Sequence, residues 1–368
     1  KEGRLVNMDS NAPNKVAGEW LRAGGLYGDV TLVRPEKTFG SSRFDFYVES
    51  ASGRQAYVEV KGVTLEREGV AAFPDAPSER AVKHVEELVE ARRQGYEAYL
   101  LFVVQMKGVC CLEPNWDTQP AFGEALKRAR KAGVRLLAYD CIVGEDSLEM
   151  DAPVPVFLDS LDRIAKPLLA WYDRGRRILP WREEPTPYHV WLSEIMLQQT
   201  RVEAVKPYYD RFFHSLPDIR SLAAVEEEKL LKLWEGLGYY NRARNLKKAA
   251  EILVSEYGGE MPDDYEKIQA LPGIGSYTAG AVSSIAFGRS YPAVDGNVLR
   301  ILSRLREDDR DILSAKVKKS VEDELLDVMP ADRPGDFNQA LMELGAMVCI
   351  PNGAPKCGVC PWNELCLA

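Results

Sequence analysis

Leu271-Pro-Gly-Ile-Gly-Ser-Tyr-Thr-Ala-Gly280 decides the fold of the C-terminal half of this chain. The stretch follows one helical pattern and opens another. Gly273 and Gly275 permit a tight turn whose free backbone N–H groups point outward. A helix N-terminus with free amides binds a phosphate without needing a basic side chain. An ordinary helix–helix turn explains the same glycines equally well. The stretch therefore predicts a helical hairpin, and a phosphate site is one of two interpretations.

The segments around this hairpin carry helical patterns almost without interruption. We expect helices over 160–174, 187–206, 226–234, 241–257, 276–287, 295–305, 314–329 and 334–347. The two prolines of Asp151-Ala-Pro-Val-Pro155 mark the point after which strand signals vanish. Residues 159–368 are therefore expected to form one all-α domain.

Residues 1–158 alternate strand and helix signals instead. Strand patterns occur at 29–33, 43–48, 55–61, 99–104 and 135–138, and helical patterns at 78–94 and 120–132. Ser52-Gly53 supplies turn chemistry, so the second and third strands are expected to form a hairpin. Ser78 is the expected N-cap of the first helix. This alternation predicts an α/β domain.

Length and composition agree with two folded domains. The chain has 368 residues, of which 46% are hydrophobic, and its net charge is −9, from 47 Lys and Arg against 56 Asp and Glu. Bulk charge gives no indication of a nucleic-acid partner, so any such site must be a local patch. No run approaches the ~20 apolar residues of a membrane span. The start, Lys1-Glu2-Gly3-Arg4, has neither an initiator Met nor the apolar stretch of a signal peptide. We expect a fragment of a cytoplasmic protein with no membrane partner.

Seven cysteines fall into two groups. Cys110, Cys111 and Cys141 lie in or beside apolar stretches and are expected to be free and buried. Cys349, Cys357, Cys360 and Cys366 have the spacing C-x7-C-x2-C-x5-C, which is typical of metal ligands. Disulfides are the alternative, and a reducing compartment argues against them. Zinc and a [4Fe–4S] cluster both take four thiolates, so the spacing leaves that choice open.

Two acids stand out in the helical half. Glu194 lies inside the apolar and amide-rich segment Ser193-Glu-Ile-Met-Leu-Gln-Gln-Thr200, and Asp295 follows Gly275 by 20 residues. A solvated helix residue is the alternative for Glu194, and an N-cap over Val298 is the alternative for Asp295.

With these motifs, residues 160–368 resemble the catalytic domain of the MutY adenine DNA glycosylases, in the helix-hairpin-helix glycosylase superfamily. The matching stretches are Leu179-Pro-Trp-Arg182, Ser193 to Arg201, Trp234-Glu-Gly-Leu-Gly-Tyr-Tyr240, Leu271 to Tyr277, Val294-Asp-Gly-Asn-Val298, Phe337-Asn-Gln-Ala340 and the four terminal Cys. The resemblance implies that these Cys hold a [4Fe–4S] cluster in a loop over 349–366. Seven residues separate Cys349 from Cys357, one more than is usual in the family, and this insertion affects the shape of the loop.

The resemblance also implies a role for each matching residue. Glu194 would protonate N7 of a flipped adenine, and Asp295 would stabilise the oxocarbenium-like sugar. Tyr277 stands where bifunctional relatives have a nucleophilic Lys, which implies excision without efficient strand cleavage. Trp181, Arg182 and Gln339 would surround the adenine, Asn297 would support Asp295, Gln199 and Tyr239 would wedge into the base stack, and Gly273 and Gly275 would hold a phosphate. A core role is the alternative for Trp181.

The implied partner is double-stranded DNA with adenine opposite 8-oxoguanine or guanine. The family usually carries a further C-terminal domain that recognises 8-oxoguanine, and this chain ends two residues after Cys366. The preference between the two mispairs is therefore left open.

The N-terminal half carries a second pattern of charged residues. The pattern consists of Asp45, 13 intervening residues and then Glu59-Val60-Lys61. It is typical of restriction-endonuclease-like sites, in which the carboxylates hold Mg²⁺. Glu59 and Lys61 share one face of their strand. Charged residues on a solvated strand face explain the pattern equally well. His84 lies four residues after Arg80 on a helix and either faces this site or lies on the surface.

Residues 4–158 resemble the sugar fermentation stimulation protein family, SfsA. The matching stretches are Asn11-Ala-Pro-Asn14, Ser42-Arg-Phe-Asp-Phe46, Tyr57 to Val63, Phe73-Pro-Asp-Ala-Pro77 and Leu101-Phe-Val-Val-Gln105. The resemblance implies a nuclease-like α/β fold that binds DNA. The family's preceding OB-fold domain has no counterpart here. Our leading hypothesis is a base-excision repair enzyme with an added DNA-contact or nicking module. The alternatives are a Mg²⁺-dependent nuclease targeted by a glycosylase-like half, and a non-catalytic DNA-binding regulator.

Overall fold

The computed structural model describes residues 5–40 and 42–368. The predicted absence of a signal peptide rests on Lys1–Arg4, which lie outside the described residues. The chain divides into two compact units, Lys1–Asp162 and Arg163–Ala368, and we describe each by itself. The boundary predicted at 158/159 lies just before the short 3-10 helix η1 (Ser160–Arg163).

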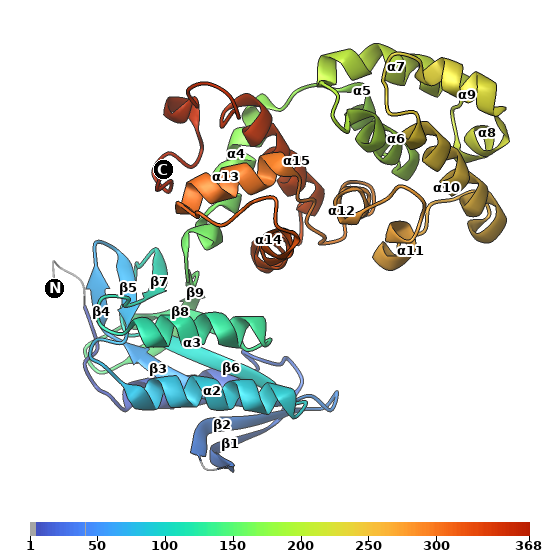
Figure 1. The fold of residues 1–368 in the computed structure, drawn as a ribbon. Coiled ribbons are helices and arrows are strands. Elements are labelled where there is room, and N and C mark those ends of the chain that lie inside the picture. Colours follow the sequence, from blue (N-terminus) through green and yellow to red (C-terminus); the bar gives the residue numbers. More distant parts are fainter. Residues whose placement is uncertain (1–4, 41) are drawn as a thin grey trace. The chain divides into compact units, whose positions relative to one another are not determined.

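The N-terminal unit is built on a sheet with the strand order β1-β2-β3-β6-β8-β9 (Figure 1). Its strands are β1 (Val30–Phe39), β2 (Ser42–Ser50), β3 (Gln55–Val63), β6 (Glu97–Val104), β8 (Arg135–Val143) and β9 (Leu148–Pro153). The central strands β3, β6 and β8 are parallel, and the pairs at each edge are antiparallel. β6 is buried over Ala98–Val104 because both of its faces are covered. A smaller sheet pairs β4 (Leu65–Arg67), β5 (Val70–Phe73) and β7 (Cys111–Pro114).

Helices cover both faces of the larger sheet. α2 (Glu79–Arg93) and α3 (Pro120–Lys131) lie side by side on one face, where Leu88 and Phe122 pack with Phe102 (Figure 1). α1 (Ala12–Arg22) covers the other face and buries Leu21 against strand residues such as Val58. The predicted α/β domain is confirmed, and Ser78 is the N-cap of α2 as expected.

Some local predictions for this unit are wrong. Cys110 is exposed, whereas Cys111 and Cys141 are buried as expected. Cys110 precedes the first residue of β7, so only its neighbour belongs to the strand. The edge strand β9 was not predicted, because it ends on Pro153 and a second proline follows at position 155, although its exposure alternates as in a half-buried strand. A proline is tolerated there because the strand lies at the edge of the sheet.

The C-terminal unit consists of helices and contains no strand in residues 163–368, all of which the structure describes. The helices are α4 (Ala165–Gly175), α5 (Pro180–Glu183), α6 (Pro187–Leu197), α7 (Val202–Ser215), α8 (Ile219–Ala224), α9 (Glu227–Trp234), α10 (Asn241–Tyr257), α11 (Tyr265–Gln269), α12 (Ser276–Ile285), α13 (Gly296–Arg306), α14 (Ala315–Val328), α15 (Pro334–Met347) and the 3-10 helix η2 (Cys357–Val359). Among the described residues, no helix is long and apolar enough to cross a membrane.

The single helix predicted over 187–206 is in fact two helices. α6 ends at Leu197 and α7 begins at Val202. Between them Gln199 has a φ of 59°, in the left-handed region that a helix cannot continue through. The apolar periodicity runs on across this break, which is why the sequence pattern did not show it.

The hairpin that opened the sequence analysis is present between α11 and α12. Gly273 has a φ of 79°, and a Cβ at this position would lie 2.8 Å from the Cβ of Asn245. Gly273 is therefore required twice, for its backbone conformation and for this close approach. Gly275 has extended backbone and is the N-cap of α12.

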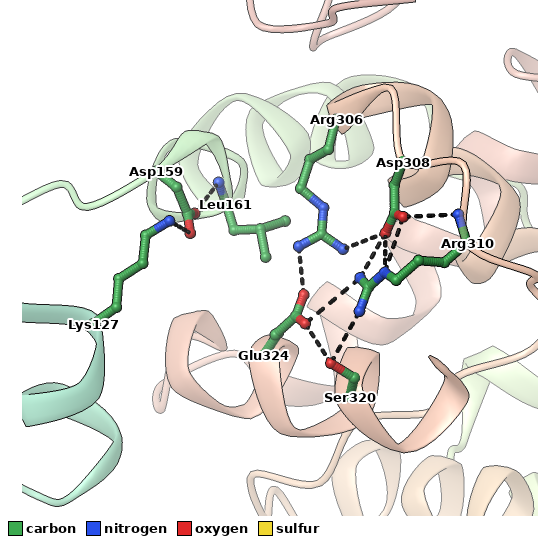
Figure 2. A network of polar contacts seen from close by, with 8 residues as sticks. All are labelled: Lys127, Asp159, Leu161, Arg306, Asp308, Arg310, Ser320 and Glu324. Atoms are coloured by element: carbon green, nitrogen blue, oxygen red, sulfur yellow. Dashed lines mark hydrogen bonds and ion pairs between the residues drawn. The ribbon is translucent and has the colours of Figure 1, made fainter. Parts of the chain in front are cut away.

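A network of charged side chains holds α14 to the C-terminal end of α13 (Figure 2). Arg306 forms an ion pair with Glu324, which also accepts a hydrogen bond of 2.7 Å from Ser320. Asp308 and Arg310 pair at 2.6 Å and extend the network along the connecting loop. Several coupled charges of this kind stabilise a contact more than one exposed ion pair does.

Candidate active site

The predicted adenine-pocket residues come together in one cavity of the C-terminal unit. The cavity has a volume of about 690 Å³. Its walls include Glu194 from α6, Tyr277 from α12 and Asp295 from the start of α13, and also Trp181, Arg182, Asn297, Gln339 and Met342. These residues come from five different parts of the sequence, so the fold alone assembles them.

Glu194 is a buried acid with a raised pKa. The pKa of its carboxyl is raised to about 7, mainly by burial and to a smaller extent by the negative charge of Asp295. A hydrogen bond of 2.6 Å from the Tyr277 hydroxyl to Oε2 and the charge of Arg182 oppose this rise. Glu194 is therefore not the solvated helix residue of the alternative interpretation. It retains a proton near neutral pH and can donate it.

Asp295, in contrast, has a hydrogen-bond donor at each carboxyl oxygen. Its Oδ1 accepts a hydrogen bond of 2.8 Å from the Val298 amide, and its Oδ2 accepts one of 2.7 Å from Nδ2 of Asn297. It is thus the N-cap of α13 and also a wall of the cavity, so both interpretations from the sequence hold. Donors at both oxygens and its place at the start of α13 hold this carboxyl group in one orientation at the cavity wall.

Trp181 likewise satisfies two interpretations. It lines the cavity, and it is buried in the hydrophobic core, where its ring meets Tyr209 edge-on at a centroid distance of 5.3 Å. A ring fixed in this way forms a rigid wall.

A buried carboxylate that no sequence pattern indicated lies beside this wall. Glu343 on α15 is fully buried between two arginines, Arg177 at 3.1 Å and Arg182 at 2.5 Å. The two arginines compensate the burial of the Glu343 charge, and Glu343 in turn holds Arg182 at the cavity. The available signal was an acid four residues after Gln339, about one turn further along the same helix.

Gln199 and Tyr239 lie together, but they line a different cavity, of about 330 Å³. Both have left-handed backbone, with φ values of 59° and 47°, which is uncommon for residues other than glycine. Tyr239 is exposed. The two predicted wedge residues therefore project from neighbouring loops that are held in strained conformations.

Arg242 fixes these two loops and was also missed. Its guanidinium donates to the carbonyls of Ile195 and Gln198, at 2.8 and 2.7 Å, and to that of Leu237 at 2.9 Å. It also lies over the ring of Trp234, at 5.4 Å. One half-buried cation thus joins the end of α6 to the loop after α9.

The hairpin presents Gly273 and Gly275 as predicted. Among the residues that the structure describes, no group accepts a hydrogen bond from either amide. Beside them, the Ser276 hydroxyl donates to Glu322 on α14 at 2.8 Å. The geometry leaves both amides free for an anion.

The four terminal cysteines are neighbours. Burial raises the pKa of the Cys360 thiol, and the nearby thiols of Cys349, Cys366 and Cys357 raise it further. Arg304 donates to Sγ of Cys349 at 3.3 Å, which places a cation beside the group. Across the described parts of the chain, no three His, Cys, Asp or Glu side chains are arranged to hold a single metal ion. The choice between zinc and an iron–sulfur cluster therefore rests on the resemblance and not on this geometry.

In the N-terminal unit, Asp45 and Glu59 lie on adjacent antiparallel strands, as predicted. The pairing of Phe46 with Val58 sets Asp45 opposite Glu59, and Oδ2 of Asp45 accepts a hydrogen bond of 2.7 Å from the Val60 amide. Burial, followed by the charge of Glu59, raises the pKa of Asp45.

Glu59 is buried rather than solvated, with an exposed fraction of 2%. Its burial alone would raise its pKa, but contacts with His84 and Lys61 outweigh burial and lower the pKa. Nζ of Lys61 lies 2.6 Å from Oε1 of Glu59, and Nδ1 of His84 contacts the same oxygen. His84 therefore faces this site and is not a surface residue.

Two family models match the chain. Residues 11–147 match the sugar fermentation stimulation protein RE domain, and residues 192–329 match the HhH-GPD superfamily of base excision DNA repair proteins. A sugar fermentation stimulation protein homolog from Clostridium beijerinckii is 50% identical over 158 residues, which is 43% of this chain and 70% of that protein. A solved thermostable thymine-DNA glycosylase has 30% sequence identity and a TM-score of 0.52, over 56% of this chain and 95% of its own. The chain belongs to both families.

The HhH-GPD part has a further relative among adenine DNA glycosylases. The enzyme of Rattus norvegicus is 44% identical over 228 residues, which is 59% of this chain and 44% of that enzyme. The chain thus spans less than half the length of this relative. The HhH-GPD match contains Glu194, Tyr277 and Asp295, whereas Trp181, Gln339 and the four terminal Cys lie outside it. The SfsA match contains Asp45, Glu59, Lys61 and His84.

Proposed function

We propose that this chain is a monofunctional adenine DNA glycosylase that removes adenine mispaired with 8-oxoguanine or guanine in duplex DNA. One observation carries the proposal. Glu194 and Asp295 line the same cavity in different environments: Glu194 is buried with its pKa raised to about 7, whereas Asp295 accepts hydrogen bonds at both oxygens. Two carboxyl groups whose environments divide them in this way serve as the acid and the charge stabiliser of glycoside cleavage.

The two groups answer two chemical needs. Adenine is a poor leaving group as an anion, so its departure requires a proton on the base. Glu194 donates that proton to N7 of the flipped adenine. The sugar that remains carries positive charge, and the Asp295 carboxylate, held by Asn297 and the Val298 amide, stabilises it.

Tyr277 determines that the reaction stops at base excision and does not proceed to strand cleavage. A Schiff-base nucleophile at this position would cleave the strand, and a phenol cannot form one. Its hydroxyl instead donates to Glu194. Water then adds to the sugar cation and loses a proton, so the product is an abasic site in an intact strand.

Base flipping is assigned to Gln199 and Tyr239. They project from two loops that Arg242 joins, so they can enter the base stack as one rigid wedge. Gly273 and Gly275 hold a phosphate of the same strand through their free amides.

The experiment that tests this proposal is a single-turnover excision assay. Duplexes carry 8-oxoguanine:adenine, guanine:adenine or thymine:adenine, and hot alkali cleaves any abasic sites that form. We expect cleavage of the adenine strand only after alkali, and only from the two mispairs. Cleavage before alkali would contradict a monofunctional enzyme, and intact mispaired strands would contradict the function.

We further propose that Cys349, Cys357, Cys360 and Cys366 hold a [4Fe–4S] cluster. Four neighbouring thiols and a nearby guanidinium support this fit. Four protein ligands leave no vacancy for substrate, so the cluster's contribution is structural. Protein purified without oxygen should contain iron and acid-labile sulfide and should be yellow-brown. One equivalent of zinc in colourless protein would contradict the cluster.

A second function is supported for the N-terminal unit, namely Mg²⁺-dependent DNA cleavage at Asp45, Glu59 and Lys61. The supporting observation is Oε2 of Glu59, a buried atom for which no described residue provides a hydrogen-bond partner. Such an oxygen beside a second carboxylate is suited to a divalent cation. Asp45→Ala should abolish Mg²⁺-dependent nicking and leave adenine excision unchanged. Absence of any divalent-dependent cleavage or binding effect in wild-type protein would leave a DNA-contact module.

A further inference from the structure

The two carboxyl oxygens of Glu59 differ in their contacts. Oε1 receives both the Lys61 ammonium, at 2.6 Å, and Nδ1 of His84. Oε2 is buried and has no hydrogen-bond partner among the described residues. A buried acceptor without a partner costs free energy, and a bound cation would supply the missing partner.

A hydrogen bond from Arg80 fixes the orientation of the His84 ring on the side away from Glu59. His84 is buried on α2, and Nε of Arg80, one turn earlier, donates to its Nε2 at 3.4 Å. Because Nε2 accepts, the ring proton of the neutral imidazole lies on Nδ1 and is donated to Glu59. Both ring nitrogens are thus engaged, and neither is available as a metal ligand.

We propose that His84, held by Arg80, is the positioning residue that keeps Oε2 of Glu59 free for a divalent cation shared with Asp45. This inference rests on the metal-binding role proposed above for the N-terminal unit. His84 occupies Oε1 together with Lys61, so the cation meets only the opposite oxygen.

Asp45 completes the arrangement. Oδ1 accepts from Nδ2 of Asn14 at 2.8 Å and Oδ2 accepts from the Val60 amide, which fixes the carboxylate opposite Glu59. Each oxygen keeps a second lone pair. Within the described residues no third His, Cys, Asp or Glu joins the two acids at one ion. This is the donor set of Mg²⁺ and Mn²⁺ sites that take their remaining ligands from water and phosphate.

The test measures Mn²⁺ binding to the full chain by the loss of the electron paramagnetic resonance signal of free Mn²⁺. His84→Leu removes the donor to Glu59, whereas His84→Asn places an amide nitrogen where Nδ1 stood. Arg80→Ala removes the hydrogen bond to Nε2 of the His84 ring. Asp45→Asn identifies the site, and His214→Leu, on the exposed face of α7, is the matched control.

We expect His84→Leu to weaken Mn²⁺ binding ~10–100-fold, as loss of an outer-shell partner does. His84→Asn and His214→Leu should bind nearly as wild type does, and Arg80→Ala should lie between. Wild-type affinity in folded His84→Leu would overturn the inference, as would equal losses in the Asn and Leu variants. If wild type shows no binding that depends on Asp45, the metal role itself fails, which is a separate result.

Discussion

Glu194 and Glu59 are two buried glutamates that the molecule treats in opposite ways. Burial raises the pKa of Glu194 to about 7, and its close partner is the neutral hydroxyl of Tyr277. Glu59 is equally buried, but Lys61 and His84 outweigh burial and lower its pKa. The partner, and not the depth of burial, decides whether a buried carboxyl donates a proton or binds a cation. The following predictions test this contrast.

The largest expected effect is on catalysis. Glu194→Gln keeps the shape of the side chain and removes its proton, so single-turnover excision should fall ~10²–10⁴-fold while duplex binding is retained. Glu59→Gln should leave excision unchanged, because it lies in a different unit. The matched control is Glu251→Gln, on the exposed face of α10. Near wild-type excision by Glu194→Gln would remove this residue from the mechanism.

The two glutamates should also affect stability in opposite directions. Below the ordinary pKa of 4.5, Glu194 is protonated in both folded and unfolded chains, so its burial costs nothing. Above pH ~7 the folded state must bury a charge, and a rise to about 7 corresponds to about 3 kcal/mol of lost stability. Glu194→Gln should therefore raise the melting temperature of its unit at pH ~8 and not at pH ~4.

Glu59 has the reverse sign. Its lowered pKa contributes stability that is present above the ordinary value of 4.5 and is lost as the pH falls through the folded pKa. Glu59→Gln should lower the melting temperature at neutral pH, with a difference from wild type that shrinks in acid. Calorimetry of both variants over this range checks the pair, and shifts of the same sign would contradict the contrast.

The sequence predicted both glutamates, but not their surroundings. Glu194 and Asp295 were found because local motifs carry them, and Asp45 and Glu59 because a hairpin register is local too. Glu343 and Arg242 were missed, because their roles depend on partners tens to more than a hundred residues away. The periodicity of an apolar helix also concealed the break at Gln199, whose left-handed backbone is imposed by tertiary contacts. Patterns report residue type and period, whereas burial and long-range partners are set by packing.

A smaller effect concerns the pH dependence of wild-type excision. Because Glu194 must be protonated to donate, the single-turnover rate should fall as the pH rises through about 7, approaching tenfold per pH unit. Duplex binding measured in parallel separates loss of the proton from loss of the complex. A rate that stays flat from pH ~6 to ~9 would show that Glu194 is not the titrating acid.

The smallest expected effect comes from Tyr277→Phe. The hydroxyl of Tyr277 donates to Oε2 of Glu194 and stabilises the ionised carboxylate, which holds the pKa of Glu194 below the value that burial alone would give. Removing the hydroxyl should therefore raise that pKa by about one unit, since one hydrogen bond to a charged group contributes ~1.5 kcal/mol. The alkaline fall in excision should move to higher pH, and the variant should exceed wild type at pH ~8 while matching it at pH ~6. Tyr265→Phe, whose ring stacks on Tyr291 outside the cavity, is the matched control and should leave the profile in place. A downward shift in Tyr277→Phe would mean that the hydroxyl stabilises the protonated acid, and the contrast between Glu194 and Glu59 would then rest on burial alone.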